Sequence, residues 1–339
     1  MSKLLVTGGA GFIGSNFIAT ALSENPGLSI INLDLLTYAG STANTKAFSG
    51  SNRYRFVKGD IRDRGAVKQL FRDHAIDGIV HFAAESHVDN SITGPENFIT
   101  TNINGTFTLL DIAREEWLES PHKIKPGKAH CRFLHVSTDE VYGSLGAEGL
   151  FREDSPYAPN SPYSASKASS DMLGRAYFHT YGLPVVTTNC SNNYGPLQHN
   201  EKLIPTIIRK ALSGQPIPIY GDGMNVRDWL YVTDHCKGIM LAFQEGRLGE
   251  TYNIGGRNER NNLYIAQRIC EILDDMAPST SGAYSELITF VTDRPGHDQR
   301  YAIDATKIET ELGWKAAENF ETGIHKTVAH YLQKYRNHE

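Results

Sequence analysis

The chain has 339 residues, of which 40% are apolar and 21% are charged, a composition typical of a globular protein with a sizeable core. Its net charge of −5 disfavours nucleic acid as a partner, because such binding needs a basic surface field. No apolar run reaches the roughly 18 residues that span a bilayer, so we expect a cytoplasmic protein with no membrane partner.

Strand-like and helix-like segments alternate along the first half of the chain. The predicted strands are 3–7, 29–34, 55–58, 78–82 and 132–137, and the predicted helices are 12–23, 63–74, 97–117 and 162–181. Short apolar strands between helices predict a Rossmann-type doubly wound α/β fold, with a parallel sheet covered on both faces. Such sheets bind ligands at the carboxyl ends of their strands.

The regular alternation is interrupted in two places. Segment 119–130 contains two prolines and several basic residues, which predict a surface loop. After about residue 190 the alternation weakens, and turn-rich stretches appear at 214–223 and 293–298. We therefore expect a cofactor domain over 1–190 and a smaller α/β substrate lobe over 191–339, with an approximate boundary that the chain can cross again.

The first predicted turn carries a dinucleotide motif. Gly8, Gly11 and Gly14 fit G-x-x-G-x-x-G between a strand and a helix, where a pyrophosphate can approach the backbone amides. Asp34 ends the second strand, and a carboxylate there suits ribose hydroxyls and repels a 2′-phosphate, which favours NAD over NADP. Asp60, followed by Ile61, ends the third strand and fits either an adenine contact or a helix cap.

Tyr163 and Lys167 are four residues apart on a predicted helix, so they share one face. Pro162 suits the first turn of that helix, and Asn160 or Ser161 can cap it. A neighbouring ammonium favours the phenolate, so we expect Lys167 to lower the pKa of Tyr163 and to make it a base for an alcohol.

Two adjacent carboxyl groups, Asp139 and Glu140, follow Thr138 at the end of the strand 132–137. A surface turn would explain them, but apolar residues lead into and out of the segment. One protonated and one ionised carboxyl in the same pocket would provide a general acid and a general base.

Longer motifs extend over the whole chain. They include A-A-E-S-H-V-D at 83–89, S-T-D-E-V-Y-G at 137–143, N-C-S-N-N-Y-G-P at 189–196, V-R-D-W-L-Y-V-T-D-H at 226–235 and R-P-G-H-D-x-R-Y-A-I-D at 294–304. Together with the glycine motif and Y-x-x-x-K, the chain resembles the thymidine-diphosphate-glucose 4,6-dehydratase family of the extended short-chain dehydrogenase/reductase superfamily.

The resemblance implies a reaction with three stages. Tyr163 would deprotonate the sugar hydroxyl at carbon 4 while NAD takes the hydride, with Thr138 bonded to that hydroxyl and Lys167 on the nicotinamide ribose. Glu140 would remove the proton from carbon 5, and Asp139 would protonate the departing hydroxyl at carbon 6. The hydride would then return to carbon 6.

The resemblance also implies two sets of binding residues and no metal. The cofactor set is Gly8, Gly11, Phe12, Ile13, Gly14, Asp34, Leu35, Thr37, Asp60, Ile61, Ala83, Ala84, Ser86, Thr101, Tyr163, Lys167 and Asn193. The sugar-nucleotide set is Ser86, His87, Thr138, Asn192, Lys202, Leu203, Pro218, Tyr220, Arg227, Asn262, Arg294, His297 and Tyr301. A homodimer packed through 97–117 and 162–181 is implied as well, although one chain could cover those faces itself.

Three other functions remain open at this point. A nucleotide-sugar 4-epimerase would share Tyr163 and Lys167 but would not need the two carboxyl groups. A dehydratase acting on another nucleotide sugar would differ only in the base pocket, where one methyl group is worth about 1–3 kcal/mol. A silent NAD-binding scaffold would need none of the reactive side chains.

Overall fold

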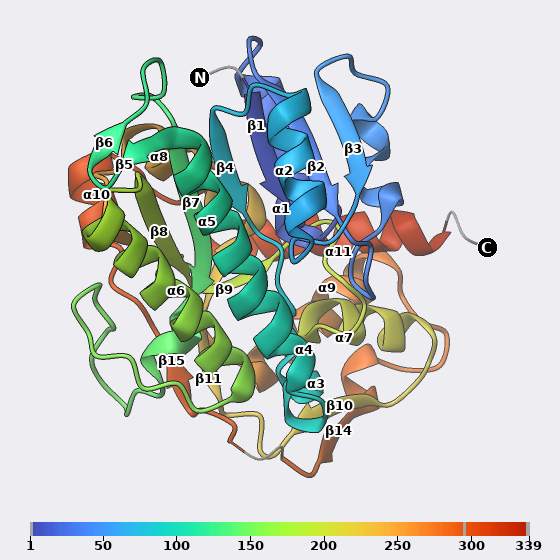
Figure 1. Cartoon of the computed structure of the whole chain (residues 1–339). Helices are drawn as coiled ribbons and strands as arrows, with labels where there is room; N and C mark the ends of the chain where they lie inside the picture. Colours follow the sequence, from blue (N-terminus) through green and yellow to red (C-terminus); the bar gives the residue numbers. More distant parts are fainter. Residues whose placement is uncertain (1–2, 294–295, 337–339) are drawn as a thin grey trace.

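A seven-stranded parallel sheet lies at the centre of the computed structural model, which describes residues 3–293 and 296–336. The strand order is β12-β8-β7-β4-β1-β2-β3, and each neighbouring pair is parallel (Figure 1). The strands are β1 Lys3–Thr7, β2 Ser29–Asp34, β3 Tyr54–Lys58, β4 Gly78–His81, β7 Arg132–Thr138, β8 Val185–Cys190 and β12 Thr251–Ile254. Most of their residues are buried, as expected when both faces of a sheet are covered.

Helices cover both faces of this sheet, and each face has its own hydrophobic core. One face carries α1 Phe12–Glu24, α8 Val232–Glu245 and α10 Thr306–Leu312, and its core includes Phe17, Ile18 and Phe243. The other face carries α2 Arg64–Asp73, α5 Thr106–Trp117 and α6 Pro162–Tyr181, and its core includes Leu109 and Trp117. The expected doubly wound α/β fold is confirmed.

The helix expected over 97–117 is not a uniform α-helix. It consists of α4 Glu96–Phe98, a π-helical segment η2 Ile99–Gly105 and then α5, and α3 Val88–Thr93 precedes it. Asn102 lies in the π-helical segment, and its side chain bonds to the Glu85 amide at 2.8 Å and to Ser166 Oγ at 2.8 Å. A π-helical turn changes the direction of side chains relative to a regular α-helix. Here the side-chain amide of Asn102 faces inward and links η2 to Glu85 and to Ser166 of α6.

Segment 119–130 is not a plain loop. It contains a short antiparallel hairpin formed by β5 Leu118–Ser120 and β6 Lys123–Ile124. Leu118 is buried, and the His122 amide donates to the Tyr181 carbonyl at 2.7 Å, so the hairpin is fixed to the end of α6. The segment lies at the surface, as predicted, but the hairpin within it was not predicted, because its anchor on α6 is a long-range contact that the local sequence does not show.

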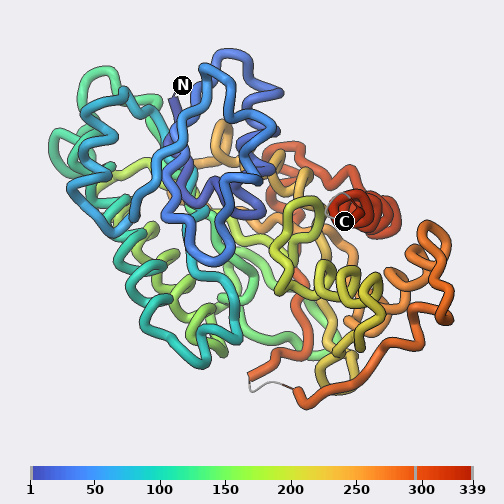
Figure 2. The backbone as a smooth tube through the Cα atoms, turned by 90° about the vertical axis from the view of Figure 1, so that its right-hand side faces the viewer, coloured from blue at the N-terminus to red at the C-terminus, as the bar shows by residue number. Residues whose placement is uncertain are grey.

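A smaller lobe lies beyond the carboxyl ends of the central strands, in yellow to red in Figure 2. Its strands are β9 Asn192–Tyr194, β10 Ile217–Tyr220, β11 Val226–Tyr231, β13 Glu259–Asn261, β14 Ile288–Val291 and β15 Arg300–Tyr301. Its helices are α7 Leu203–Leu212, α9 Asn262–Met276 and α11 Phe320–Arg336, and the short 3-10 helices of the chain are η1 Thr42–Phe48, η3 Asp139–Tyr142 and η4 Tyr284–Leu287. The chain crosses between the two parts more than once, because α8 and β12 return to the central sheet after β11.

All four cysteines are buried free thiols, as expected from their spacing. Within 3–293 and 296–336, none of the helices combines the length and the apolar character required to cross a membrane.

Candidate active site

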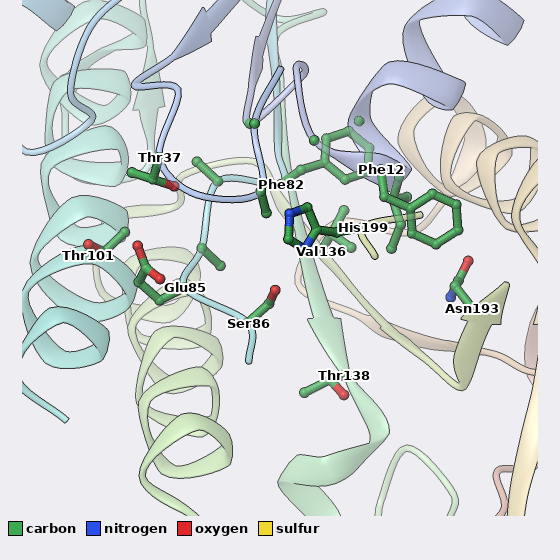
Figure 3. A pocket seen from close by; sticks show the side chains of 18 of the residues that line it. Phe12, Thr37, Phe82, Glu85, Ser86, Thr101, Val136, Thr138, Asn193 and His199 are labelled. Atoms are coloured by element: carbon green, nitrogen blue, oxygen red, sulfur yellow. The ribbon is translucent and has the colours of Figure 1, made fainter. Parts of the chain in front are cut away.

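One cavity lies at the carboxyl ends of the central strands, where the fold predicts a ligand. Every residue expected around the cofactor lines it, as do the five reactive residues Thr138, Asp139, Glu140, Tyr163 and Lys167. In Figure 3, Thr138 lies at the end of its strand, with Ser86 and Glu85 on one side of the cavity and Phe12 and Asn193 on the other. The cavity therefore joins the two motifs that the sequence analysis treated separately.

The glycine turn between β1 and α1 fits a dinucleotide. Gly8 adopts a φ of +72°, and a Cβ atom there would lie 2.6 Å from the Ala83 amide nitrogen. A Cβ atom on Gly14 would lie 2.4 Å from the Gly8 carbonyl oxygen. The N-cap of α1 is Gly11, which has no side chain to occupy the first amides of the helix, so these amides can receive a pyrophosphate.

Asp34 lies at the end of β2, where a ribose-binding carboxylate is expected. Its Oδ2 accepts from the Ala10 amide at 2.9 Å and its Oδ1 from the Leu36 amide at 2.8 Å, so the carboxylate is fixed beside the glycine turn. The alternative function for Asp60, a helix cap, belongs instead to Asp63, whose side chain accepts from the Ala66 amide. Asp60 lines the cavity and forms a 2.6 Å ion pair with Arg62.

Tyr163 and Lys167 project from the first two turns of α6, which begins with a capping box between Ser161 and Ser164. Burial raises the pKa of Tyr163, the charge of Glu140 raises it further, and a hydrogen bond with Thr138 lowers it. The expected lowering by Lys167 is wrong for this arrangement, because burial dominates. The Lys167 ammonium donates to the Val136 carbonyl at 2.8 Å, and burial lowers its own pKa.

The two carboxyl groups after β7 differ in their surroundings. Asp139 is 2% exposed, and burial raises its pKa well above the ordinary range, with further increases from Glu140 and Asp228. Its Oδ1 accepts from Thr138 Oγ1 at 3.3 Å, whereas its Oδ2 has no hydrogen-bond partner among the described residues. Burial therefore favours the protonated form of Asp139, which is the form that a general acid needs.

Arg227 and Tyr301 approach this pair from the smaller lobe. The Arg227 guanidinium lies 4.3 Å from the centre of the Tyr301 ring, and its charge lowers the pKa of Asp139. Its Nη2 donates to the Asp298 carbonyl at 2.9 Å. Asp298 also accepts from Asn160, just before α6, at 2.7 Å, so this part of the lobe is tied to the start of the catalytic helix.

The remaining residues of the sugar-nucleotide set fall into three groups. Ser86, Asn192 and Lys202 line the cavity, and His87 and Leu203 directly follow two of them. Pro218, Tyr220, Asn262 and His297 lie farther out on the smaller lobe and do not line the cavity; the Tyr220 and His297 rings are 6.4 Å apart. Arg294 lies outside the described residues.

The segment between β9 and α7 lines the cavity, and most of its residues were not predicted from the sequence. Gln198, His199 and Glu201 lie between β9 and α7 and line the cavity, together with Glu85 after β4. Lys202 donates to the Ser86 carbonyl at 3.1 Å, and the His199 ring lies 5.7 Å from that of Tyr38. Only Lys202 gave a signal in the sequence, because these contacts join segments that are far apart along the chain.

Three side chains with metal-ligand spacing lie at the amino ends of the central strands, at the opposite end from the cavity. Asp77, His130 and Cys131 place donor atoms within 4.8 Å of one another. The Asp77 carboxylate lies 3.1 Å from His130 Nε2 and accepts from the Lys3 amide at 3.3 Å. These contacts connect the beginnings of β1, β4 and β7, and the group is not part of the cavity.

Comparisons with known proteins agree with this geometry. The model of the family described as GDP-mannose 4,6 dehydratase matches residues 5–327. A "Probable dTDP-glucose 4,6-dehydratase" of Sinorhizobium fredii is 56% identical over 331 residues, covering 98% of this chain and 93% of that protein.

Two solved structures show what the fold alone leaves open. The crystal structure of DesIV (dTDP-glucose 4,6-dehydratase) from Streptomyces venezuelae, with NAD and TYD bound, is 46% identical, covers 98% of each chain and has a TM-score of 0.88. A UDP-glucose 4-epimerase from Thermotoga maritima, with UDP-glucose, is 26% identical, covers 98% of this chain and 99% of its own, and has a TM-score of 0.84. Because both share the architecture, the reaction has to be argued from the side chains.

Proposed function

The chain belongs to the family described as GDP-mannose 4,6 dehydratase, and we propose that it is a hydro-lyase that uses NAD to convert dTDP-glucose to dTDP-4-keto-6-deoxy-glucose. The observation that carries this proposal is the composition of the cavity. It places Tyr163 and Lys167 beside Asp139 and Glu140, with Thr138 between them. An epimerase needs the first pair only, whereas loss of water also needs an acid and a base.

The first stage is oxidation at carbon 4. NAD, when bound, supplies a positively charged nicotinamide that takes a hydride from carbon 4 and later returns it to carbon 6. Tyr163 accepts the proton of the carbon 4 hydroxyl in its phenolate form, which burial disfavours and which the positive charges of Lys167 and of bound NAD would favour. Thr138, hydrogen-bonded to Tyr163, orients that hydroxyl. Lys167 provides the positive charge on the face of α6 that carries Tyr163.

The second stage removes water across carbons 5 and 6. The new ketone acidifies the hydrogen on carbon 5, and Glu140 takes it as a proton. Asp139, held protonated by its burial, gives its proton to the hydroxyl leaving carbon 6. Glu140 then returns a proton to carbon 5 as the hydride reaches carbon 6. The net change is one lost water, and before the next turnover Tyr163 has to release a proton and Asp139 has to regain one.

The two parts of the molecule divide the binding work in this proposal. Residues 1–190 hold NAD through the glycine turn and Asp34, and residues 191–339 hold the nucleotide end of the sugar. Arg227 is close enough to the carboxyl pair for its charge to lower the pKa of Asp139, and a planar guanidinium suits a diphosphate. Tyr220 and His297 lie at the outer end, at a position suited to a nucleoside base.

Turnover on matched substrates tests the proposal. We expect the purified protein to form a 4-keto sugar from dTDP-glucose, seen by its absorbance in alkali, and to do so faster than from UDP-glucose or GDP-mannose. Interconversion of two hexoses without the 4-keto product would indicate an epimerase. Binding of NAD and sugar without any turnover would indicate a scaffold.

We also propose that the protein is a cytoplasmic homodimer joined through η2, α5 and α6. Ile99, Phe107 and Met172 are exposed on these elements by 44%, 45% and 51%, and contiguous apolar exposure of this kind favours an interface. Phe107→Glu should convert the dimer to a monomer in size-exclusion chromatography with light scattering. Phe290→Glu, on a ring of β14 that is 57% exposed, is the matched control and should leave the dimer intact.

A further inference from the structure

A buried carboxyl group lies behind the reactive lysine and has no part in the reaction described above. Asp171 follows Lys167 by one helical turn on α6 and is 5% exposed. Three side chains converge on it: Ser137 Oγ donates at 2.8 Å, Tyr157 Oη donates at 3.0 Å, and His135 Nε2 lies at 3.0 Å. The two hydroxyl donors suit the ionised form of the carboxyl group, because a carboxylate only accepts hydrogen bonds, and His135 is a third donor in the tautomer that is protonated at Nε2.

These contacts hold α6 against the last residues of β7, next to the active site. His135 and Ser137 are alternate residues of β7, so their side chains lie on the same face of the strand and both reach Asp171. The residue between them, Val136, uses its carbonyl to accept from Lys167. One short stretch of β7 therefore fixes Lys167 and Asp171 together, and Thr138 and Asp139 follow directly in the chain.

We propose that Asp171 is a positioning residue whose negative charge holds Lys167 protonated and in place beside Tyr163. The inference rests on the proposed roles of Tyr163 and Lys167. Two independent features carry it: the hydrogen bonds that fix the carboxylate, and its place one turn beyond the ammonium on the same helical face. Because Asp171 does not line the active-site cavity but interacts electrostatically with Lys167, it acts through Lys167.

Ionisable groups on four elements surround Asp171. Lys167 is the cation on α6, His135 lies on β7, Tyr157 precedes α6, and His81 on β4 packs 5.4 Å from the His135 ring. Burial lowers the pKa of both histidines and so favours their neutral forms. Burial raises the pKa of Asp171 to about 7, while Lys167, Ser137 and Tyr157 lower it. The ionised form is therefore lost as pH falls through about 7, and the support for Lys167 is lost with it.

Two measurements test this arrangement. In Asp171→Asn, we expect kcat for dTDP-glucose to fall about 10- to 100-fold with KM within about twofold, because positioning is lost and binding is not. The fall of wild-type kcat on the acid side, near pH 7, should disappear in this variant. Asp234→Asn is the matched control: it removes a buried carboxylate of α8 that accepts from the Ala317 and Glu318 amides, and it should leave the pH profile of kcat unchanged.

The second measurement needs no turnover. In protein labelled with carbon-13 at the aspartate carboxyl groups, the resonance missing from Asp171→Asn should titrate near pH 7. It should titrate at higher pH in Lys167→Met and in Tyr157→Phe, because each change removes a group that lowers the pKa of Asp171. An unchanged titration in Lys167→Met, or an Asp171→Asn enzyme with normal kcat and the same acid limb, would overturn the proposal. A wild-type protein that does not turn over dTDP-glucose would refute the proposed function instead.

Discussion

The catalytic corner, formed by Thr138–Glu140 and the first turns of α6, differs sharply from the outer lobe surface, formed by Pro218, Tyr220, Asn262 and His297. In the catalytic corner, Asp139, Tyr163 and Lys167 are 2%, 8% and 4% exposed. On the outer lobe surface, Tyr220 is 43% exposed and Val291, its partner in β14, is 38% exposed. The reactive groups of the first region are buried, whereas the second region is half-buried apart from the exposed ring of Tyr220.

This difference in burial assigns the reaction to the catalytic corner and the binding of the nucleoside to the outer lobe surface. The reactive groups need shifted pKa values, and burial supplies these whether or not a sugar is present. A nucleoside base needs only a complementary surface, which can remain open. We therefore expect substitutions in the catalytic corner to lower kcat and substitutions on the outer lobe surface to raise KM.

The largest effect is expected from Tyr163→Phe. It removes the only proposed acceptor for the proton at carbon 4, so kcat should fall by about 10²–10⁴-fold, with the KM for dTDP-glucose little changed. Stopped-flow absorbance at the reduced nicotinamide band should show no transient. Tyr177→Phe is the matched control, because that phenol lies on the same helix and contacts Asp111 at 3.3 Å, away from the cavity. Near-normal turnover by Tyr163→Phe would contradict the assigned role.

A smaller but more diagnostic effect is expected from Glu140→Gln. Oxidation at carbon 4 should still occur, but elimination should slow by about 10²-fold or more because no base remains for the proton on carbon 5. Reduced nicotinamide should then accumulate, and the hydrogen on carbon 5 should not exchange with solvent deuterium. Mass spectrometry of recovered sugar measures this exchange, and retained exchange in the variant would assign the base to another residue.

The catalytic corner could be predicted from sequence because its geometry is local. Tyr163 and Lys167 need only a helix to share a face, and Thr138–Glu140 need only a strand end. The cofactor turn is local for the same reason. The direction of the Tyr163 pKa could not be predicted, because it depends on burial, and burial is set by elements such as β8 and α4 that are distant in the chain.

The features that the sequence did not reveal are all long-range. The segment that carries His199 and Glu201 reaches the cavity through contacts with Tyr38 and Ser86, more than a hundred residues earlier in the chain. Similarly, the hairpin after α5 depends on a contact with Tyr181. Local patterns establish elements and neighbouring side chains, but they cannot establish which loops meet.

On the outer lobe surface, Tyr220→Ala should raise the KM for dTDP-glucose about 3- to 10-fold and leave kcat unchanged, because one partly exposed aromatic contact is worth about 1 kcal/mol. The neighbouring Phe290→Ala is the matched control and should change neither constant. Initial rates over a range of dTDP-glucose concentrations measure both. A fall in kcat without a change in KM would show that this surface also contributes to the chemistry, and the separation between the two regions would fail.

The smallest effect expected is a gain in stability from Asp139→Asn. In the folded protein, burial disfavours the ionised form of the Asp139 carboxyl group. Burial raises the pKa of Asp139, so between its ordinary value of 3.8 and its raised folded value the unfolded chain ionises more readily than the folded one. This difference destabilises the wild-type fold increasingly as pH rises, and asparagine removes it while keeping the shape of the protonated acid. Thermal unfolding should therefore show equal Tm values near pH 4 and a Tm roughly 1–3 °C higher for the variant near pH 8. Asp222→Asn, at an exposed turn of the smaller lobe, should give no such gain at any pH. The measured quantity is the Tm of the variant minus the Tm of the wild type. If this difference is the same at pH 8 as at pH 4, Asp139 is ionised in the folded protein and cannot be the acid.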